Sequence, residues 1–172
     1  MKKAVWSGIM TAVGMLAMST SVYAQAQTAS GTVNVNASVN AKAKLTINGG
    51  ATASISFADA DPDVVATLPA APLTIAVKAR TSANGAVTLT VRASQDLTAA
   101  PLVTIDISGL KWTATGANFA GSGTSSTAAE VNVMSVNGSG SHTGIQSYTL
   151  DNSWAYATGT YTTTLTYTLT AP

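Results

Sequence analysis

Residues 33–47, VNVNASVNAKAKLTI, alternate strictly between apolar and polar side chains. The odd-numbered positions are apolar: Val33, Val35, Ala37, Val39, Ala41, Ala43, Leu45 and Ile47. The even-numbered positions are polar: Asn34, Asn36, Ser38, Asn40, Lys42, Lys44 and Thr46. Such alternation is typical of a β-strand with one buried face. At about 3.3 Å per residue the run would extend roughly 50 Å, far beyond a usual strand of roughly 20 Å. Either the chain turns without losing phase, or the first half leaves its own domain and pairs with another structure.

The beginning of the chain has the features of a secretory signal. Residues 1–3 (MKK) are basic, residues 4–18 are an uncharged apolar stretch, and residues 22–24 (VYA) fit the small-x-small cleavage rule. The apolar stretch is shorter than the roughly 20 residues that a membrane span needs. We therefore predict that residues 1–24 are a cleaved signal peptide, that Gln25 begins the mature chain, and that the mature protein has no membrane span.

Composition excludes several classes of function. Without Lys2 and Lys3, six Lys and Arg face seven Asp and Glu, a net charge of −1 that offers no basic surface for nucleic acid or anionic lipid. Only 9% of residues are charged, against roughly 25% in an ordinary soluble domain. The chain has no cysteine, which excludes disulfides, thiol nucleophiles and cysteine-ligated metals. About 150 mature residues suit one domain with a real core.

The mature chain predicts an all-β sandwich or barrel, because short alternating segments recur between Gly, Asn, Pro and Ser residues. The expected strands are 41–47, 53–57, 73–79, 87–93, 102–107, 110–114, 131–136, 145–150 and 160–170. Asn84-Gly85 lies between two matched strands, a strong signal for a β-hairpin. The last segment places tyrosine and leucine on one face and threonine on the other, as in a strand with one wet side.

Little in the sequence points to catalysis. His142 is the only histidine, and we expect it to be a solvated residue in a Gly/Ser-rich turn, with no nucleophile motif beside it. We predict that the protein is not an enzyme and has no cofactor; a secreted hydrolase would have to depend on His142. Asp59, Asp61 and Asp63 could offer oxygen ligands to calcium, but the Gly and the distant Glu of an EF-hand are missing. A turn rich in Asp and Pro is the favoured interpretation, and no metal site is predicted.

Aromatic side chains have two interpretations. A sugar-stacking platform could draw on Trp112, Tyr148, Trp154, Tyr156 and Tyr161. In a sandwich of this size such residues more often fill the core or its corners. We therefore expect core or corner positions for Trp112, Trp154, Tyr161 and Tyr167.

A sandwich with one empty strand position exposes a hydrophobic groove, which an extended segment of a neighbour can fill by strand addition. Three features bear on this idea: the signal, residues 32–39 (TVNVNASV), and residues 159–169 (GTYTTTLTYTL). With them the chain resembles the major subunits of bacterial pili, or fimbriae, that assemble by donor-strand exchange in the manner of the chaperone–usher type. Many of those subunits have a disulfide near the first strand, which this chain does not.

The resemblance implies an incomplete immunoglobulin-like β-sandwich over residues 41–172 and a donor strand within the N-terminal extension, residues 25–40. Val33, Val35, Ala37 and Val39 would fill the groove of a neighbouring copy. The partners would be further copies in a head-to-tail homopolymer, together with a periplasmic chaperone and an outer-membrane usher. The protein would pass through the periplasm to a filament on the cell surface and support adhesion or biofilm formation.

Another interpretation stays open. Residues 33–47 could be two consecutive strands of a complete domain. The protein would then be a monomeric, secreted or surface-bound sandwich that binds carbohydrate through Trp112 or Trp154.

Overall fold

The computed structural model describes residues 29–172, so the predicted signal peptide over residues 1–24 lies outside the described residues. Residues 29–41 contain no strand, and their side chains are exposed. Residues 38–172 group as one folded unit, called the body below. The predicted division of the mature chain into residues 25–40 and 41–172 stays a prediction.

Eleven strands and one short 3-10 helix make up the body. They are β1 (Lys42–Ile47), β2 (Thr67–Pro69), β3 (Leu73–Arg80), β4 (Ala86–Ala93), β5 (Leu97–Ala99), β6 (Val103–Ile105), η1 (Ile107–Gly109), β7 (Leu110–Thr115), β8 (Ser122–Thr124), β9 (Val131–Asn137), β10 (Gly140–Asp151) and β11 (Leu165–Thr170). The all-β class predicted from the alternation is therefore confirmed.

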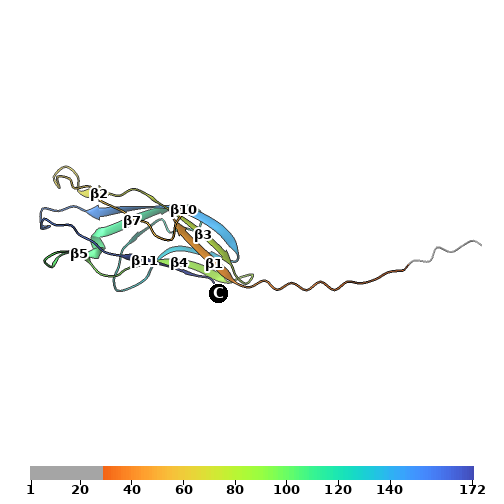
Figure 1. Ribbon diagram of the computed structural model, residues 1–172. Coiled ribbons are helices and arrows are strands. Elements are labelled where there is room, and N and C mark those ends of the chain that lie inside the picture. The colour runs from red at the N-terminus through yellow and green to blue at the C-terminus, as the bar shows by residue number, and fades with distance from the viewer. Residues whose placement is uncertain (1–28) are drawn as a thin grey trace, which may run out of the picture. The chain divides into compact units, whose positions relative to one another are not determined.

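The strands form antiparallel sheets in an arrangement consistent with a β-sandwich. The larger sheet has the order β1-β3-β10-β7-β8, with β2 paired to the far end of β10. The second has the order β11-β4-β9, and β5 pairs with β6 in a separate small sheet. Figure 1 shows β3, β10 and β7 in one layer and β4 and β11 in the other.

The core lies between the inward faces of these sheets. β3 and β4 both alternate between buried and more accessible residues, as strands with one buried face must. The largest side chains with almost no exposure are Trp112, Tyr148, Ile75, Leu89, Leu110 and Met134. Without disulfides in the chain, this apolar burial is the main favourable contribution to stability.

The predicted hairpin around Asn84-Gly85 is wrong. β3 pairs with β1 and β10, whereas β4 pairs with β11 and β9, so the two strands lie in different sheets. The connection is a tight turn in which the Gly85 N–H donates to the Ser82 carbonyl at 3.0 Å. Both strands have a fully buried face, and placing them in opposing sheets buries those faces against one another. A local turn signal does not distinguish a turn between strands of two different sheets from a hairpin within one sheet.

Three predicted strand boundaries also differ. Residues 53–57 form no strand apart from an isolated bridge between Phe57 and Ala70. The C-terminal strand begins at Leu165 rather than at residue 160. β10 begins at Gly140, five residues earlier than expected, because the Gly/Ser-rich segment pairs with β3. In each case a distant partner, or the lack of one, decided whether an alternating segment became a strand.

Candidate binding groove

One side of the body has two unpaired strand edges. β1 and β11 are the terminal strands of their sheets, and within residues 29–172 the only strand that pairs with β1 is β3 and the only one that pairs with β11 is β4. Ile47, the last residue of β1, also forms an isolated bridge with Gly50. The two strands contact each other, so their free edges lie on the same side. Each edge presents backbone N–H and C=O groups that could pair with an additional strand.

The opposite side of the body is closed. There the Ala120 N–H donates to the Val133 carbonyl at 2.8 Å, and the Ala114 N–H donates to the Gly121 carbonyl at 3.0 Å. The segment between β7 and β8 is thereby hydrogen-bonded both to the larger sheet and to β9 of the second sheet. The described residues have no such backbone link between β1 and β11.

A groove of about 1370 Å³ opens on the side of β1 and β11. Leu45 and Ile47 of β1 line one wall, and residues 161–167, which lead into β11, line another. The segment 51–57, which forms no strand and has one isolated bridge from Phe57 to Ala70, contributes Ile55 and Phe57. The lining therefore combines apolar side chains with many threonine, serine and backbone groups, a mixture that suits an extended peptide segment.

The inward-facing side chains of β11, of which Leu165 and Tyr167 line the groove, are incompletely covered. Leu165, Tyr167 and Leu169 of β11 face inward, yet each is only half-buried. Their direct neighbours on β4 are Ala93, Val91 and Leu89, and these three side chains have at most 1% of their surface exposed. The two strands share one sheet and one alternation. The difference is that β11 has a neighbour on one edge only.

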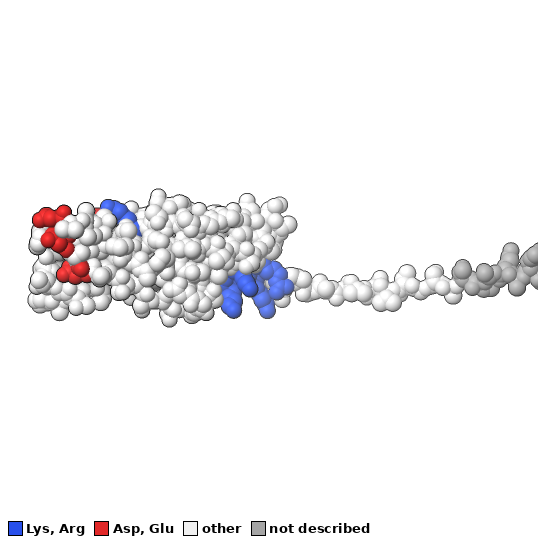
Figure 2. All heavy atoms as spheres, turned by 90° about the horizontal axis from the view of Figure 1, so that it is seen from above, with Lys and Arg blue, Asp and Glu red and all other residues white. Residues whose placement is uncertain are grey.

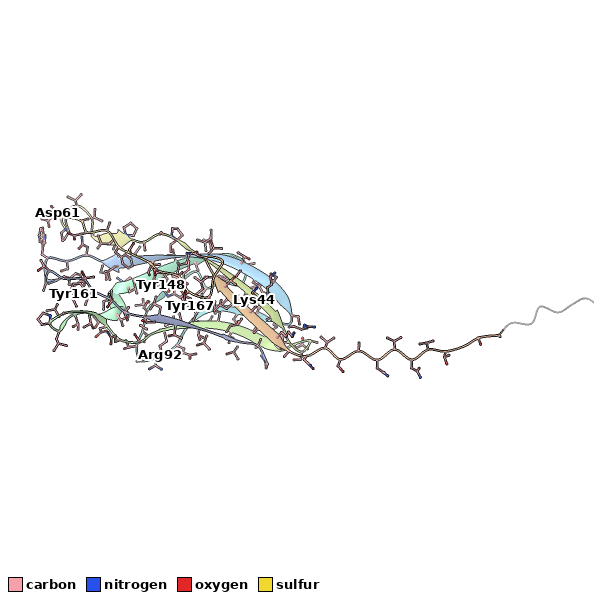
Figure 3. The ribbon with its side chains drawn as sticks, in the orientation of Figure 1. Lys44, Asp61, Arg92, Tyr148, Tyr161 and Tyr167 are labelled. Carbon is pink, nitrogen blue, oxygen red and sulfur yellow. The ribbon has the colours of Figure 1, made fainter. Side chains whose placement is uncertain are left out.

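A buried polar chain joins the two sheets beside the groove. The Tyr167 hydroxyl of β11 donates to Gln146 Oε1 at 2.6 Å and lies 2.7 Å from the Tyr148 hydroxyl of β10 (Figure 3). Because the single Tyr167 proton goes to Gln146, Tyr148 donates to Tyr167. The Gln146 side-chain nitrogen is buried and has no partner among the described residues. These hydrogen bonds hold the edge strand β11 against the centre of the larger sheet.

Burial keeps both phenols neutral. It raises the pKa of Tyr167 to about 12, although the hydrogen bond from Tyr148 partly opposes this rise. The pKa of Tyr148 is raised further, mainly by burial and also by the nearby Tyr167. Neither group ionises near neutral pH, so their role is structural.

The residues predicted to donate a strand are accessible. Val33 and Val35 are 87% and 85% exposed, Val39 is 67% exposed, and Ala37 is exposed as well. Isolated apolar side chains on a surface are ordinary, whereas exposed apolar side chains gathered in one place are typical of an interaction surface. These four residues lie before β1 and form no strand in the monomer.

The acidic loop does not assemble a metal site. Among residues 29–172 no group of three or more His, Asp or Glu side chains is placed to hold an ion. Asp61 Oδ1 instead accepts from the Asp63 N–H at 2.9 Å, and Asp63 Oδ1 accepts from the Trp154 indole N–H at 3.1 Å. Asp59 lines the groove and is exposed. The favoured interpretation, a turn rich in Asp and Pro, agrees with this geometry.

The predicted core and corner aromatics have different environments. Trp112 is fully buried, and Gly123 on β8 makes room for it, since a Cβ there would lie 2.3 Å from the indole ring. Tyr167 belongs to the polar chain described above. Tyr161 is half-buried before β11 and donates to the Ala157 carbonyl at 2.7 Å. Trp154 does not plug the core: it is 70% exposed, because its indole rests on the acidic loop.

His142 does not lie in a turn as expected, because β10 includes it. It is half-buried opposite Val77 of β3, and its Nδ1 atom lies 3.3 Å from Asn118 Nδ2. No hydroxyl or carboxylate is hydrogen-bonded to its ring among the described residues. The geometry around His142 is that of a strand residue with a neutral hydrogen-bond partner.

Sequence reasoning missed most of the groove. It did not identify Leu45, Ile47, Ile55, Phe57 or Leu165 as wall residues, because their shared location depends on how distant strands pair. The alternation in residues 41–47 and 53–57 was a usable signal for which side chains face inward. It carried no information about which of them would stay uncovered.

Comparison of the chain with models of protein families found no match, and comparison with curated proteins found no significant match. None of the helical structure within residues 29–172 has the length and apolar character needed to span a bilayer.

Proposed function

We propose that this protein is a structural subunit of a bacterial surface filament, a pilus or fimbria, that polymerises by donor-strand exchange and supports adhesion or biofilm formation. The observation that carries the proposal is the groove between β1 and β11, with a free backbone edge on each side and half-exposed apolar side chains between them. A groove of this kind is a liability in an exported protein unless something fills it.

The N-terminal extension has the pattern of such a filler. Residues 32–40 alternate with four apolar side chains, and nine residues of extended chain span roughly 30 Å. The segment from Tyr161 to Leu169 also comprises nine residues; it lines the groove as far as Tyr167, and every second side chain along it is half-buried. Length and periodicity therefore match between the segment and the site.

In the proposed assembly the body is an incomplete immunoglobulin-like sandwich. Val33, Val35, Ala37 and Val39 of one copy fill the groove of the next, while the polar residues between them face solvent. Because the contact is head-to-tail and the donating segment precedes its own fold, repetition gives an open filament rather than a closed ring. The predicted signal peptide supports export, and a periplasmic chaperone and an outer-membrane usher are the partners proposed for assembly.

The decisive experiment removes the donor and supplies it separately. A chain without residues 25–40 should lose polymerisation but bind a peptide of residues 32–40 with 1:1 stoichiometry, measured by calorimetry. A peptide with Val35→Asp is the matched control and should not bind. Circular dichroism checks that the shortened chain folds; if it does not, the full chain with Val35→Asp serves as the acceptor. Normal polymerisation without residues 25–40 would contradict the proposal.

A carbohydrate-binding sandwich is the second candidate, and the exposed indole of Trp154 favours it. Exposed aromatic rings can stack on sugars, and here Asp63 orients the ring. This alternative predicts a monomer whose retention on a glycan array is lost on Trp154→Ala and is unaffected by deletion of residues 25–40. The filament proposal predicts the opposite sensitivity for assembly.

A further inference from the structure

The cations of the body gather at one end, which corrects the expectation from the net charge that the protein has no basic surface. Four of the six Lys and Arg in residues 29–172 lie on two neighbouring strands, Lys42 and Lys44 on β1 and Lys78 and Arg80 on β3. Lys42 lies directly opposite Arg80, and Lys44 directly opposite Lys78, so all four share the solvent-exposed face of the sheet. Figure 2 shows them as one basic group, called the basic end below.

This arrangement is unfavourable for an isolated body. Like charges directly opposite one another on adjacent strands repel. The only salt bridge among the described residues is Lys111–Asp151, so no carboxylate in the body compensates the basic end. In a chain with 9% charged residues, an anionic partner would relieve the repulsion among these four adjacent cations.

Acidic residues gather at the other end of the body. The loop with Asp59, Asp61 and Asp63 is fixed there by Asn152, whose side chain donates to the Ala60 and Val65 carbonyls. Asp106 directly precedes η1, and Asp96 Oδ1 accepts from the Ile107 N–H, next to the start of β7. The acidic end thus has five carboxylates outside a salt bridge, beside the Lys111–Asp151 pair: Asp59, Asp61, Asp63, Asp96 and Asp106.

The length of β10 separates the two ends. Gly140 at its start pairs with Ala79 beside the basic end, and Asp151 at its finish pairs with Thr67 beside the acidic loop. Its 12 residues correspond to roughly 36 Å. Figure 2 shows the acidic residues at the end opposite the basic one.

We propose that the basic end of one copy docks on the acidic end of the next copy; this inference rests on the proposed function. The donor segment, residues 32–40, is followed almost at once by Lys42, the first residue of β1. The basic end of the donating copy must therefore lie next to the end of the groove from which residue 40 emerges. At the basic end of the acceptor, the donor's cations would meet the acceptor's own cations. At the acidic end they meet Asp59 and Asp61, which line the groove there.

The charges therefore select one direction of insertion. β11 runs from the acidic end toward the basic end, since Thr170 pairs with Thr88 at the start of β4 and the Pro172 carbonyl accepts from the Thr81 hydroxyl. A donor segment whose residue 40 emerges at the acidic end runs antiparallel to β11. Head-to-tail polarity of the filament then follows from electrostatics as well as from the groove.

The donor segment itself cannot supply the electrostatic preference for one direction, because residues 25–41 contain no charged side chain. Any dependence of assembly on ionic strength must come from the bodies. This property separates docking of the bodies from filling of the groove, and it gives the experiment an internal control.

The test compares elongation with peptide binding at two salt concentrations. Elongation of the full chain should slow about tenfold between low and high NaCl, as electrostatically steered association does. Binding of the neutral peptide 32–40 to the full chain carrying Val35→Asp should change less than about twofold, because the peptide brings no charge to the groove. Salt-independent elongation, or peptide binding as salt-sensitive as elongation, would overturn the docking proposal.

Charge reversals identify the two surfaces. Lys44→Glu and Asp59→Lys should each slow elongation about fivefold at low salt, and the two together should restore it by reversing both partners. Arg92→Glu, an equal change of charge on β4 away from both ends, is the control and should have little effect. Lys44→Glu should leave the melting temperature of the full chain carrying Val35→Asp unchanged or raised, because it removes the repulsion with Lys78.

The possible results separate the two proposals. If neither reversal slows elongation while Val35→Asp still prevents it, docking of the charged ends is wrong and donor-strand exchange stands. If both reversals slow elongation but their combination does not restore it, the two ends do not meet and the docking proposal falls. If Val35→Asp polymerises normally, donor-strand exchange itself is wrong.

Discussion

β4 and β11 lie side by side in one sheet and alternate in the same way, yet their inward faces differ in burial. Leu89 and Val91 on β4 are almost completely buried, whereas Leu169 and Tyr167, their partners on β11, are half-exposed. β4 has a neighbour on each edge, and β11 has one on a single edge. The alternation of a strand determines which side chains face inward, and its neighbours determine how far those side chains are buried. Under the proposed function, a donated segment would make the environment of β11 resemble that of β4.

Val35→Asp should have the largest effect, because it prevents the missing neighbour from binding. Burial of the Val35 side chain in the groove should contribute about 1.5–3 kcal/mol to the free energy of binding, and an unpaired buried carboxylate in its place adds a further penalty. We expect no filaments in electron micrographs of this variant. Asn36→Asp places the same carboxylate on the opposite face of the segment and should assemble. Equal behaviour of the two variants would contradict the assigned register.

Leucine-to-alanine changes on β4 and β11 test directly whether burial differs between the two strands. Leu89→Ala should lower the free energy of unfolding by about 2–5 kcal/mol, with or without added peptide, because that site is already fully buried. Leu165→Ala should cost about 1 kcal/mol in the monomer and more when peptide 32–40 is bound, since binding completes its burial. Urea unfolding of each variant with and without peptide provides the measurement. A cost for Leu165→Ala that is independent of peptide would mean that the peptide does not cover β11.

Alkaline pH tests the polar chain that anchors β11. Burial raises the pKa of Tyr167 from its ordinary value of 10 to about 12, so the folded state favours the neutral phenol. The resulting stabilisation is complete below pH 10 and is lost as the pH rises through about 12. The free energy of unfolding of the native chain should therefore fall more steeply over this range than that of the Tyr148→Phe/Tyr167→Phe variant.

At neutral pH, Tyr167→Phe alone should cost about 1–2 kcal/mol, because it leaves Tyr148 and Gln146 without a hydrogen-bond partner. The double variant should cost less than the sum of the two single changes, since it removes both phenols of the pair. In the alkaline-pH test, parallel profiles of the free energy of unfolding for the native chain and the double variant would show that ionisation of these phenols does not affect stability.

Trp154→Ala should have the smallest effect. This side chain is 70% exposed beside the acidic loop, and its hydrogen bond to Asp63 is accessible to solvent. The free energy of unfolding should change by less than about 0.5 kcal/mol, and filament assembly should be retained. A loss of stability as large as that of Leu165→Ala would mean that the Trp154 side chain contributes to the packing around the groove.

The sequence predicted the strands better than their partners. Residues 73–79, 87–93, 110–114 and 131–136 are strands within one or two residues of the expected bounds. The Asn84-Gly85 hairpin was wrong because residues 73–80 and 86–93 pair with strands far away in the chain. Residues 53–57 alternate without forming a strand for the same reason, since hydrogen bonding requires a partner that the local pattern does not specify.

The candidate site was predictable only in part. The alternating row from Val33 to Val39 was recognisable from the sequence, because it belongs to the run 33–47, whose length exceeds what one strand of a small domain can use. The groove was not, because Leu45 and Leu165 are 120 positions apart in the numbering and meet only when β1 and β11 become neighbouring edges. The same holds for the basic end, where Lys44 and Lys78 become neighbours through the register of β1 and β3.

The amino-acid order by itself determined the all-β class, the inward and outward faces of most strands, and the absence of cysteine and of charge in the leading segment. These are local properties, set by a two-residue period and by composition. Only the tertiary structure decided that two strand edges remain free, that a groove with half-buried apolar side chains lies between them, and that most cations and most carboxylates gather at opposite ends. Pairing and register are non-local, and they depend on which combination of distant faces buries the most surface with the fewest unpaired backbone groups.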